Sequence, residues 1–512
     1  MLSNEEIQID IDGTDSGGDA VSASASTTKA TKLPRAKATK TAAAKPAKAP
    51  PKKKASAKRP AAPAADGSNT EDGIADAAGG AKKKKKKAAA AAGKVKLLEY
   101  PTDPQEIASL ALAHPTPKPP APIPSSINAA HPLRLHPTAD IRDRGHIMSI
   151  VLSPDGTILA TFSTLGTVRL WDTETWALLT VLRDEAEESI DEFLCGAFTP
   201  DMTRIVVGGK LKDPKRWSEA DNDNHILPCP LKVFDIMSGN VVERLEGHEE
   251  EILCVKLVSF CNKNYFVTTS QDGYIIKWQI GPDWRGMQSR VTFKDGETCM
   301  AFAVSFLPHT GNRYLIAACD SGLTVFDFEL ETKIQHFSTL YSCYCDCALV
   351  VDLVDFPSSP LWTADATGTV DGDDDDAAVF AYVVSRGVEE VEAVDGENVA
   401  INTIPNTVAI HKLSYPATKG APFVLTEVKR LTHDQYRSNS WLIKIASNGR
   451  HVLAPTYDGG VVVFNAKTGQ ATGVLRDHDS VEVRDALFSP EGWTATCGDD
   501  GMVKVYLQDQ AA

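Results

Sequence analysis

The chain lacks the features that would place it in a membrane or in a secretory pathway. It has no run of about 18 apolar residues, which a bilayer-spanning helix requires. Its start, Met1–Glu6, lacks the basic and then apolar order of a secretory signal. Its ten cysteines, such as Cys195, Cys254 and Cys497, occur singly and not in a disulfide-like framework, which is typical of a reducing compartment. We therefore expect an intracellular protein.

The signatures of catalysis and metal binding are also missing. No Gly-rich phosphate loop precedes a predicted helix, and there is no nucleophile elbow. Cys343, Cys345 and Cys347 alternate on a predicted strand, where side chains about 6.5–7 Å apart do not close a tetrahedral site. The run Asp371–Asp376 lacks the spaced Glu of a calcium loop, so we interpret it as a solvated loop. We expect a protein that is not an enzyme and has no cofactor, metal or small-molecule substrate.

Large apolar residues are nearly absent from the first ninety-odd positions, and the charge is divided along the chain. Residues 1–95 hold 19 Lys and Arg against 10 Asp and Glu, a net charge of +9, which leaves 34 against 58, a net of −24, for the remainder. A segment with nothing to bury cannot offset its ordering entropy. We therefore predict a disordered basic tail over residues 1–95, followed by a Pro-rich linker over residues 96–130.

The tail resembles the lysine-, alanine- and proline-rich tails of linker histones. It contains two groups of basic residues that suit nuclear import or contact with phosphate backbones. These groups are Lys52, Lys53, Lys54, Lys58 and Arg59, and then Lys82, Lys83, Lys84, Lys85, Lys86 and Lys87. A solvated spacer, or a tail attracted to the acidic remainder of its own chain, is the alternative. The tail predicts a nuclear location, with a cytoplasmic one as the alternative.

From residue 131 onward the chain repeats one pattern: an apolar strand, a turn, a second strand, Asp-Gly or a relative of it, and a third strand that ends in an aromatic residue. The clearest copy runs from Gly247-His248 through Asp272-Gly273 to Trp278. One such small sheet cannot bury both of its faces alone, so copies must stack around an axis. We expect seven copies between about residues 146 and 508, which together form one domain over residues 131–512.

With Trp171-Asp172 at the end of the first copy, the pattern resembles the WD-repeat β-propeller family. The resemblance implies an all-β fold: a seven-bladed WD40 β-propeller preceded by a disordered basic region. The second copy carries an insert over residues 210–230, and the fifth carries an acidic insertion over about residues 363–400. The last copy has only three strands. In this family a strand from the start of the domain completes such a sheet, and Leu133–His136 is our candidate.

The resemblance also implies a buried polar network within a copy. In the third copy it matches His248, Ser270 or Thr268, Asp272 and Trp278, for which we expect structural roles. The first copy has Leu165 where the Asp belongs, and the seventh has Tyr506 for the Trp. A buried His–Asp pair needs its full set of partners to offset desolvation. We therefore expect only the third copy to hold the complete network.

Propellers of this family act by presenting loops to partners, so we looked for Trp, Tyr and Arg on loops that lead into first strands. These candidates are Trp284, Arg285, Tyr436, Arg437, Trp441 and Arg484. Packing between blades is the alternative for each of them.

The predicted function is a non-enzymatic nuclear scaffold within a multi-subunit complex, whose acidic ring binds a protein or peptide and whose tail contacts nucleic acid or chromatin non-specifically. The alternative is a receptor or adaptor subunit of a ubiquitin ligase. Such receptors often carry Trp-Asp-x-Arg, where this chain has Glu174.

Overall fold

The computed structural model describes residues 135–219, 222–293, 298–359, 379–389, 405–416 and 420–508. All of these residues belong to one compact unit, residues 92–512. They form strands and turns and contain no helix. Consequently, no helix in the described ranges is long and apolar enough to cross a membrane. The basic groups of the tail, the linker and most of the acidic insertion lie outside the described residues.

The described strands form seven antiparallel sheets, which we number in chain order of their first strands. The first sheet contains β2 (Ile147–Leu152), β3 (Ile158–Ser163), β4 (Thr167–Asp172) and β5 (Leu178–Arg183). The second contains β6 (Ile190–Phe198), β7 (Arg204–Ser218), β9 (Leu231–Asp235) and β10 (Val241–Leu245), with β8 (Asp223–Leu227) paired to β7. The third contains β11 (Ile252–Phe260), β12 (Lys263–Ser270), β13 (Ile275–Ile280) and β14 (Met287–Phe293).

The remaining sheets repeat this meander. The fourth contains β15 (Ala301–Phe306), β16 (Tyr314–Cys319), β17 (Gly322–Asp327) and β18 (Thr332–Phe337). The fifth contains β19 (Tyr344–Val351), β20 (Phe380–Val388), β21 (Thr407–Ser414) and β22 (Val424–Thr432). The sixth contains β23 (Ala446–Ser447), β24 (His451–Pro455), β25 (Val461–Asn465) and β26 (Ala471–Leu475). The seventh contains β27 (Val483–Phe488), β28 (Trp493–Gly498), β29 (Met502–Gln508) and β1 (Leu135–Arg142).

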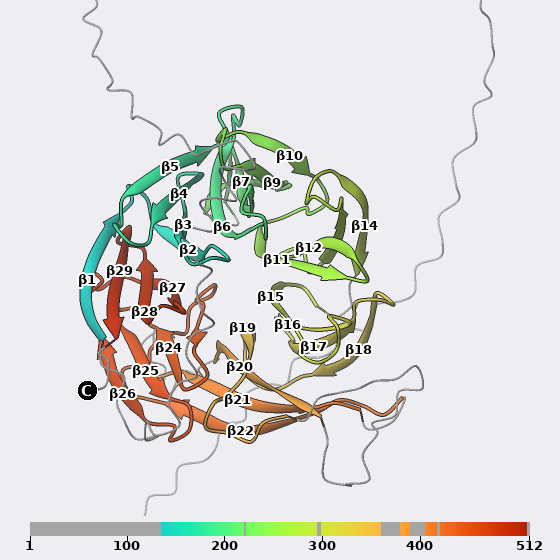
Figure 1. Ribbon diagram of the computed structural model, residues 1–512, viewed down its shortest axis with the longest axis vertical. Coiled ribbons are helices and arrows are strands. Elements are labelled where there is room, and N and C mark those ends of the chain that lie inside the picture. The colour runs from blue at the N-terminus through green and yellow to red at the C-terminus, as the bar shows by residue number, and fades with distance from the viewer. Residues whose placement is uncertain are drawn as a thin grey trace, which may run out of the picture. The chain divides into compact units, whose positions relative to one another are not determined.

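The seven sheets follow one another in a closed circle, with their first strands innermost (Figure 1). Each first strand contacts the next along the chain, and β27 contacts β2. A separate hydrophobic cluster fills the space between each pair of neighbouring sheets, including the seventh and the first. This arrangement of four-stranded antiparallel sheets is consistent with the predicted propeller.

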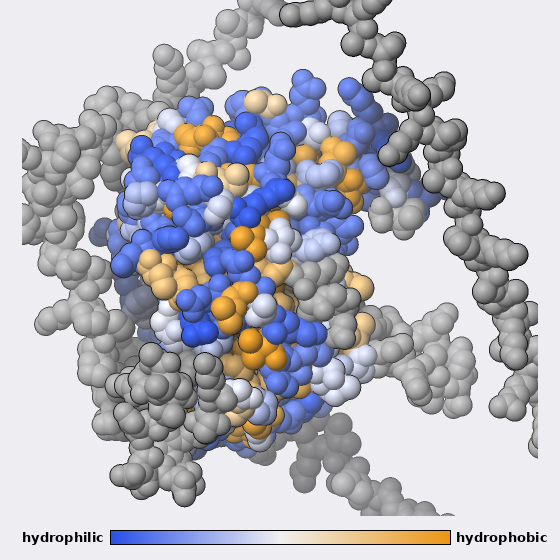
Figure 2. Space-filling view, turned by 90° about the vertical axis from the view of Figure 1, so that its right-hand side faces the viewer, coloured by the Kyte–Doolittle hydropathy of each residue, from blue (hydrophilic) through white to orange (hydrophobic). Residues whose placement is uncertain are grey.

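Burial decreases from the middle strands of a sheet to its outermost strand. β3 and β25 are buried along their whole length, because neighbouring sheets cover both of their faces. The fourth strands, such as β22, alternate between exposed and partly buried residues. On the side of the circle that carries β14 and β18, hydrophobic residues form small groups among hydrophilic ones (Figure 2). This side therefore shows no continuous apolar face of the kind that marks a docking surface.

The strand that completes the seventh sheet comes from the start of the described chain. β1 pairs antiparallel with β29, from Leu135 opposite Gln508 to Arg142 opposite Met502. It therefore begins at Leu135, within the segment Leu133–His136 that the sequence suggested, and continues six residues beyond it. Ile141 is 3% exposed and packs between the first and seventh sheets. β1 therefore covers the edge of β29 and joins the two ends of the circle.

Candidate functional site

The polar network predicted for the third sheet is present, with Thr268 at its centre. His248 Nδ1 lies 2.9 Å from Asp272 Oδ2, and His248 Nε2 lies 2.7 Å from Thr268 Oγ1. Trp278 Nε1 donates to the same Thr268 oxygen over 2.9 Å. Of the two residues that the sequence offered for this position, Ser270 has another role: its hydroxyl accepts the backbone N–H of Asp272 and shapes the turn.

The direction of the hydrogen bonds in this network follows from donor chemistry. An indole N–H can only donate, and an ionised carboxylate can only accept. A neutral His248 therefore carries its proton on Nδ1, facing Asp272, and Thr268 donates to Nε2. Burial alone would raise the pKa of Asp272, but the interactions with His248 and the hydrogen bonds from the backbone N–H groups of Tyr274 and Glu249 together outweigh it and lower the pKa. Asp272 therefore stays ionised, and the group acts as a fixed brace between the loop and the strands.

The first and seventh sheets show what happens when one member is missing. In the seventh, His478 contacts Asp500 and Thr496, each over 2.9 Å, while Tyr506 donates its hydroxyl to Asp477. In the first, Trp171 donates to Thr161 over 3.2 Å, but the side chain of His146 is 58% exposed. Without the carboxylate, the first histidine gains no buried partner and stays at the surface.

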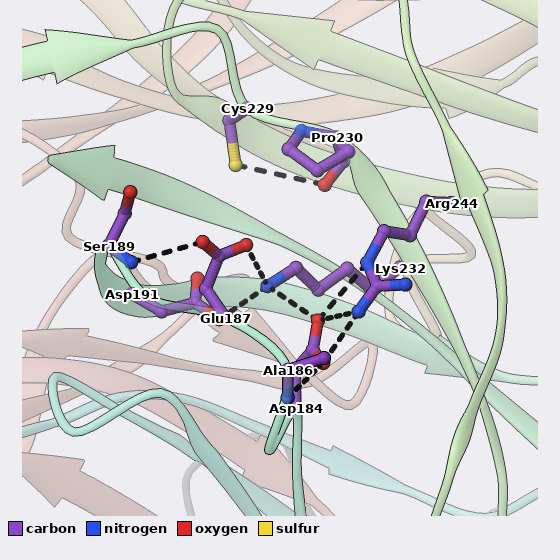
Figure 3. A network of polar contacts seen from close by, with 9 residues as sticks. All are labelled: Asp184, Ala186, Glu187, Ser189, Asp191, Cys229, Pro230, Lys232 and Arg244. Carbon is purple, nitrogen blue, oxygen red and sulfur yellow. Dashed lines mark hydrogen bonds and ion pairs between the residues drawn. The ribbon is translucent and has the colours of Figure 1, made fainter. Parts of the chain in front are cut away.

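The second sheet replaces this network with a buried lysine (Figure 3). Lys232, at the start of β9, is 1% exposed. Its Nζ lies 2.7 Å from Asp191 and 3.2 Å from both Asp184 and Glu187. Arg244, from β10, donates to Asp184 over 2.6 Å. Lys232 occupies the strand position of Ile276, because each stands two residues before the aromatic residue that ends its third strand.

The charges in this cluster account for its pKa shifts. Burial would lower the pKa of Lys232, but the attraction of Asp191, Glu187 and Asp184 outweighs it and raises the pKa. Burial raises the pKa of Asp191 more than Lys232 lowers it. Lys232 therefore remains charged and holds the acidic segment before β6 against the sheet.

The centre of the circle is closed by apolar side chains from six of the seven sheets. We call this group the channel cluster, and its members come from the first strands or from the residues just before them. It contains buried Leu194, Leu253, Phe302 and Leu442, with partly buried Met148, Met300 and Tyr344. The rings of Phe302 and Tyr344 stack at 5.3 Å.

Because the strands alternate in direction, each first strand begins at the same end of the circle as the turn between its second and third strands. We call this end the mouth.

A repeated β-bulge directs four of these side chains inward. The pairing of the first with the second strand shifts register on either side of Met148, Leu194, Leu253 and Phe302. Each is therefore the extra residue of a bulge, where the regular alternation of side chains is interrupted. In the fifth and seventh sheets the corresponding extra residues are Asp346 and Arg484.

A lysine spans the centre of the circle next to this cluster. Lys444 Nζ, between the sixth and seventh sheets, donates to Ser149 Oγ over 2.8 Å and to the carbonyl oxygen of Leu194 over 3.1 Å. Ser149 in turn donates to Asp485 over 2.8 Å. Burial raises the pKa of Asp485, although Lys444 opposes this. These contacts connect four sheets through the centre, so this part of the channel is a structural brace.

A fully buried ion pair links the fifth sheet to the segment before β23. Arg386 Nε lies 2.9 Å from Asp346 Oδ1, and both side chains are 0% exposed. Arg386 also donates to Ser438 Oγ over 3.1 Å and to the carbonyl oxygen of Ser440 over 2.7 Å. Burial, partly offset by Arg386, raises the pKa of Asp346 to about 6. Asp346 lies between Cys345 and Cys347, in the segment whose cysteines drew attention in the sequence.

Two of the predicted partner-binding residues are buried and a third is partly buried and ion-paired, which corrects their proposed exposure on loops. Trp284 is 8% exposed because a tight turn folds it back, so that its ring stacks on Phe266 at 6.1 Å. Tyr436 is 0% exposed and packs against Phe464. Arg484 is held by Asp499 and Glu482. Packing and ion pairing, not partner contact, account for these three.

The other predicted partner-binding residues differ in exposure. The side chain of Arg285 is 54% exposed beside Asp283, and Trp441 is 37% exposed next to Leu442 of the channel cluster. Arg437 is partly buried. A role of these three residues in partner binding remains a prediction. The tail residues assigned to nuclear import lie outside the described residues.

The described residues offer no group of three or more His, Cys, Asp or Glu side chains that could hold a metal. Cys345 and Cys347 are buried thiols, whereas Cys343 is exposed. A cavity of about 290 Å³ lies between the third and fourth sheets, and its lining includes Lys263 and Lys277. Lys277 is already bonded to the carbonyl oxygen of Phe328 and to Glu331. The apolar arrangement at the mouth is therefore the best candidate site for contact with a partner.

The comparison with known families agrees with this geometry. The family model for the WD domain, G-beta repeat, matches residues 139–172 and 239–279. The chain contains WD40 repeats. The two matched segments cover most of the first and third sheets, whose third strands carry Trp171 and Trp278, respectively. No curated protein matches the chain. WD40 repeats imply a protein-interaction scaffold, and such domains are typically non-enzymatic.

The sequence did not identify the channel cluster, although a signal for it exists. An apolar residue stands at the second position of the first strand in three WD40-like copies, as Met148, Leu253 and Phe302. Regular alternation predicts only which of two faces such a residue occupies, and a bulge breaks that alternation. Comparison of the copies position by position would have singled out this site.

Proposed function

We propose that the circle of sheets is a seven-bladed WD40 propeller that acts as a non-enzymatic, nuclear protein-interaction scaffold. The observation that carries the proposal is the partly exposed apolar floor at the mouth. Met148, Met300 and Tyr344 of the channel cluster are each partly buried, and Trp441, which directly precedes Leu442 of this cluster, is 37% exposed. Apolar and aromatic side chains that stay partly exposed are typical of a site that anchors a protein or peptide partner.

Charge favours a basic partner. The chain outside the tail has a net charge of −24, and near the mouth two carboxylates, Glu482 and Asp499, share a single cation, Arg484. A protein or peptide segment with one apolar anchor and basic neighbours therefore complements this surface. Opposite charge raises the association rate and selects among partners more than it raises affinity.

Substitution of Trp441 and Met300 tests the site at the mouth. Trp441→Ala combined with Met300→Ala is expected to weaken binding of proteins captured by the full chain at physiological salt at least tenfold, because the variant loses its anchoring surface. Capture followed by identification and titration of the recovered proteins measures this. Leu330→Ala is the matched control, because Leu330 is 61% exposed in the turn between β17 and β18, at the opposite end of the circle. Equal binding by the two variants would contradict the proposed site.

The basic tail is proposed to supply nuclear import and non-specific association with nucleic acid or chromatin. Its Lys-rich groups suit import receptors and phosphate contact, and binding through counterion release is weak and sensitive to salt. Deletion of residues 1–95 is expected to abolish nuclear accumulation and retention on nucleic acid while the sheets stay folded. Fluorescence microscopy and binding to duplex DNA at two salt concentrations measure both effects. A truncated chain that localises and binds like the full chain would refute this part of the proposal.

A further inference from the structure

The second sheet carries a two-stranded ribbon that the other described sheets lack. Beyond Lys212, β7 leaves the sheet and pairs only with β8. Lys212 stands opposite Ile226 and Trp217 opposite Asn224, so the four residues from Asp213 to Arg216 face His225 alone. This large bulge is ordered by hydrogen bonds, because Asp213 accepts the N–H of Lys215 over 2.8 Å and the Asn224 side chain over 2.9 Å.

The base of the ribbon is fixed to the body of the protein. Lys212 Nζ lies 2.6 Å from Glu192 and 3.0 Å from Asp223, while Lys210 Nζ lies 3.0 Å from Glu251. Leu211 is buried in the core between the second and third sheets. Burial would lower the pKa of Lys212, but its carboxylate partners raise it, so these ion pairs are formed at neutral pH. An isolated two-stranded ribbon is marginally stable, and this anchoring makes it a rigid element.

The distal part of the ribbon exposes Lys215, Arg216 and Trp217 side by side. Trp217 is 58% exposed, although burial of an indole is among the largest hydrophobic gains available to a fold. The structure of the sheet does not require this side chain, because the second sheet is complete without β8. Trp and Arg on a rigid support are the residue types that dominate protein interfaces.

We propose that this ribbon is a second docking element, distinct from the channel cluster, which inserts Trp217 into an apolar pocket bordered by carboxylates on an acidic protein partner. Lys215 and Arg216 supply the charge complementarity. A protein segment fits better than a nucleic acid, because the ribbon presents only two cations beside Trp217 and its base carries Glu192, Glu251 and Asp223. A polyanion would need many more phosphate contacts than these two cations supply.

The test uses fluorine NMR of the full chain labelled with 5-fluorotryptophan. The chain has eight tryptophans, and the signal that disappears in Trp217→Phe belongs to Trp217. The probes are a panel of Glu-rich peptides that each carry one Leu, Met or Phe anchor, the same peptides with Lys in place of Glu, and a single-stranded thymidine oligonucleotide. We expect the Trp217 signal to shift saturably with acidic peptides alone and less at high salt. Trp217→Ala and the double change Lys215→Glu with Arg216→Glu should each weaken binding at least tenfold.

Met237→Ala provides the matched control, because Met237 is 53% exposed in the turn between β9 and β10, away from the ribbon. It should bind like the unchanged protein, and thermal unfolding should show that Trp217→Ala keeps its fold. The proposal is overturned if no acidic peptide shifts the Trp217 signal, if the variants bind as well as the unchanged protein, or if the oligonucleotide is the probe that shifts it.

Discussion

Deletion of residues 1–142 is expected to abolish the cooperative unfolding of the sheets, whereas deletion of residues 1–134 is expected to preserve it. The longer deletion removes β1, which pairs with β29 along its length and places Ile141 between the first and seventh sheets. Without it, the circle is open at one point and the edge of β29 is exposed to aggregation. The loss, on the order of 5 kcal/mol, is comparable with the entire net stability of many domains. Urea unfolding followed by circular dichroism measures it.

A single substitution in β1 tests its packing without shortening the chain. Ile141→Asp places an unpaired carboxylate in a buried cluster and is expected to lower the free energy of unfolding by about 4 kcal/mol. Arg142→Asp, at the exposed neighbouring position, is the matched control and should cost less than about 1 kcal/mol. If both variants unfold at the same urea concentration as the unchanged protein, β1 does not close the circle in solution.

Local chemistry made much of the fold predictable. The turn at Asp272-Gly273 needs a positive φ, which Gly273 adopts at 77°, and its tight contact with the backbone of Thr298 and Cys299 leaves no room for a Cβ. Second and third strands are rich in apolar residues. This pattern indicates burial on both faces and can be read from the sequence without knowing which strands are neighbours. The repetition of these signals predicted sheets that must share their faces.

The parts that the sequence did not predict depend on contacts between distant residues. Tyr436 and Trp284 occupy loops, and only the folding of those loops onto neighbouring strands shows that both are buried. Arg386 and Asp346 lie 40 positions apart on adjacent strands, β20 and β19, and neither carries a local mark of burial. The bulges that direct the channel cluster inward are set by the pairing of first and second strands. Residue type and spacing therefore indicated the strands and turns. The residues that form the candidate site depend on strand register and on how loops fold onto neighbouring strands, which the sequence did not predict.

A single-residue effect as large as that of Ile141→Asp is expected at the buried ion pair of the fifth sheet. Arg386→Met should lower the free energy of unfolding by about 4 kcal/mol, because it leaves Asp346 ionised and unpaired in the interior. It also removes the hydrogen bonds to Ser438 and Ser440, which tie the fifth sheet to the segment before the sixth. Equilibrium unfolding in urea at pH 7.5 measures the loss.

The pH dependence of this loss tests its cause. Burial raises the pKa of folded Asp346 to about 6, above the ordinary value of 3.8, so the fold loses stability as the pH rises from 3.8 to about 6, and the full cost is present above that pH. Arg386 lowers this pKa, so its removal raises the pKa further, and the deficit of Arg386→Met should shrink as the pH falls from 7.5 to 5. The double change Arg386→Met with Asp346→Leu removes both charges and should recover most of the stability at pH 7.5. A deficit that is independent of pH, together with a double variant as unstable as the single one, would show that packing and not the unpaired carboxylate controls this site.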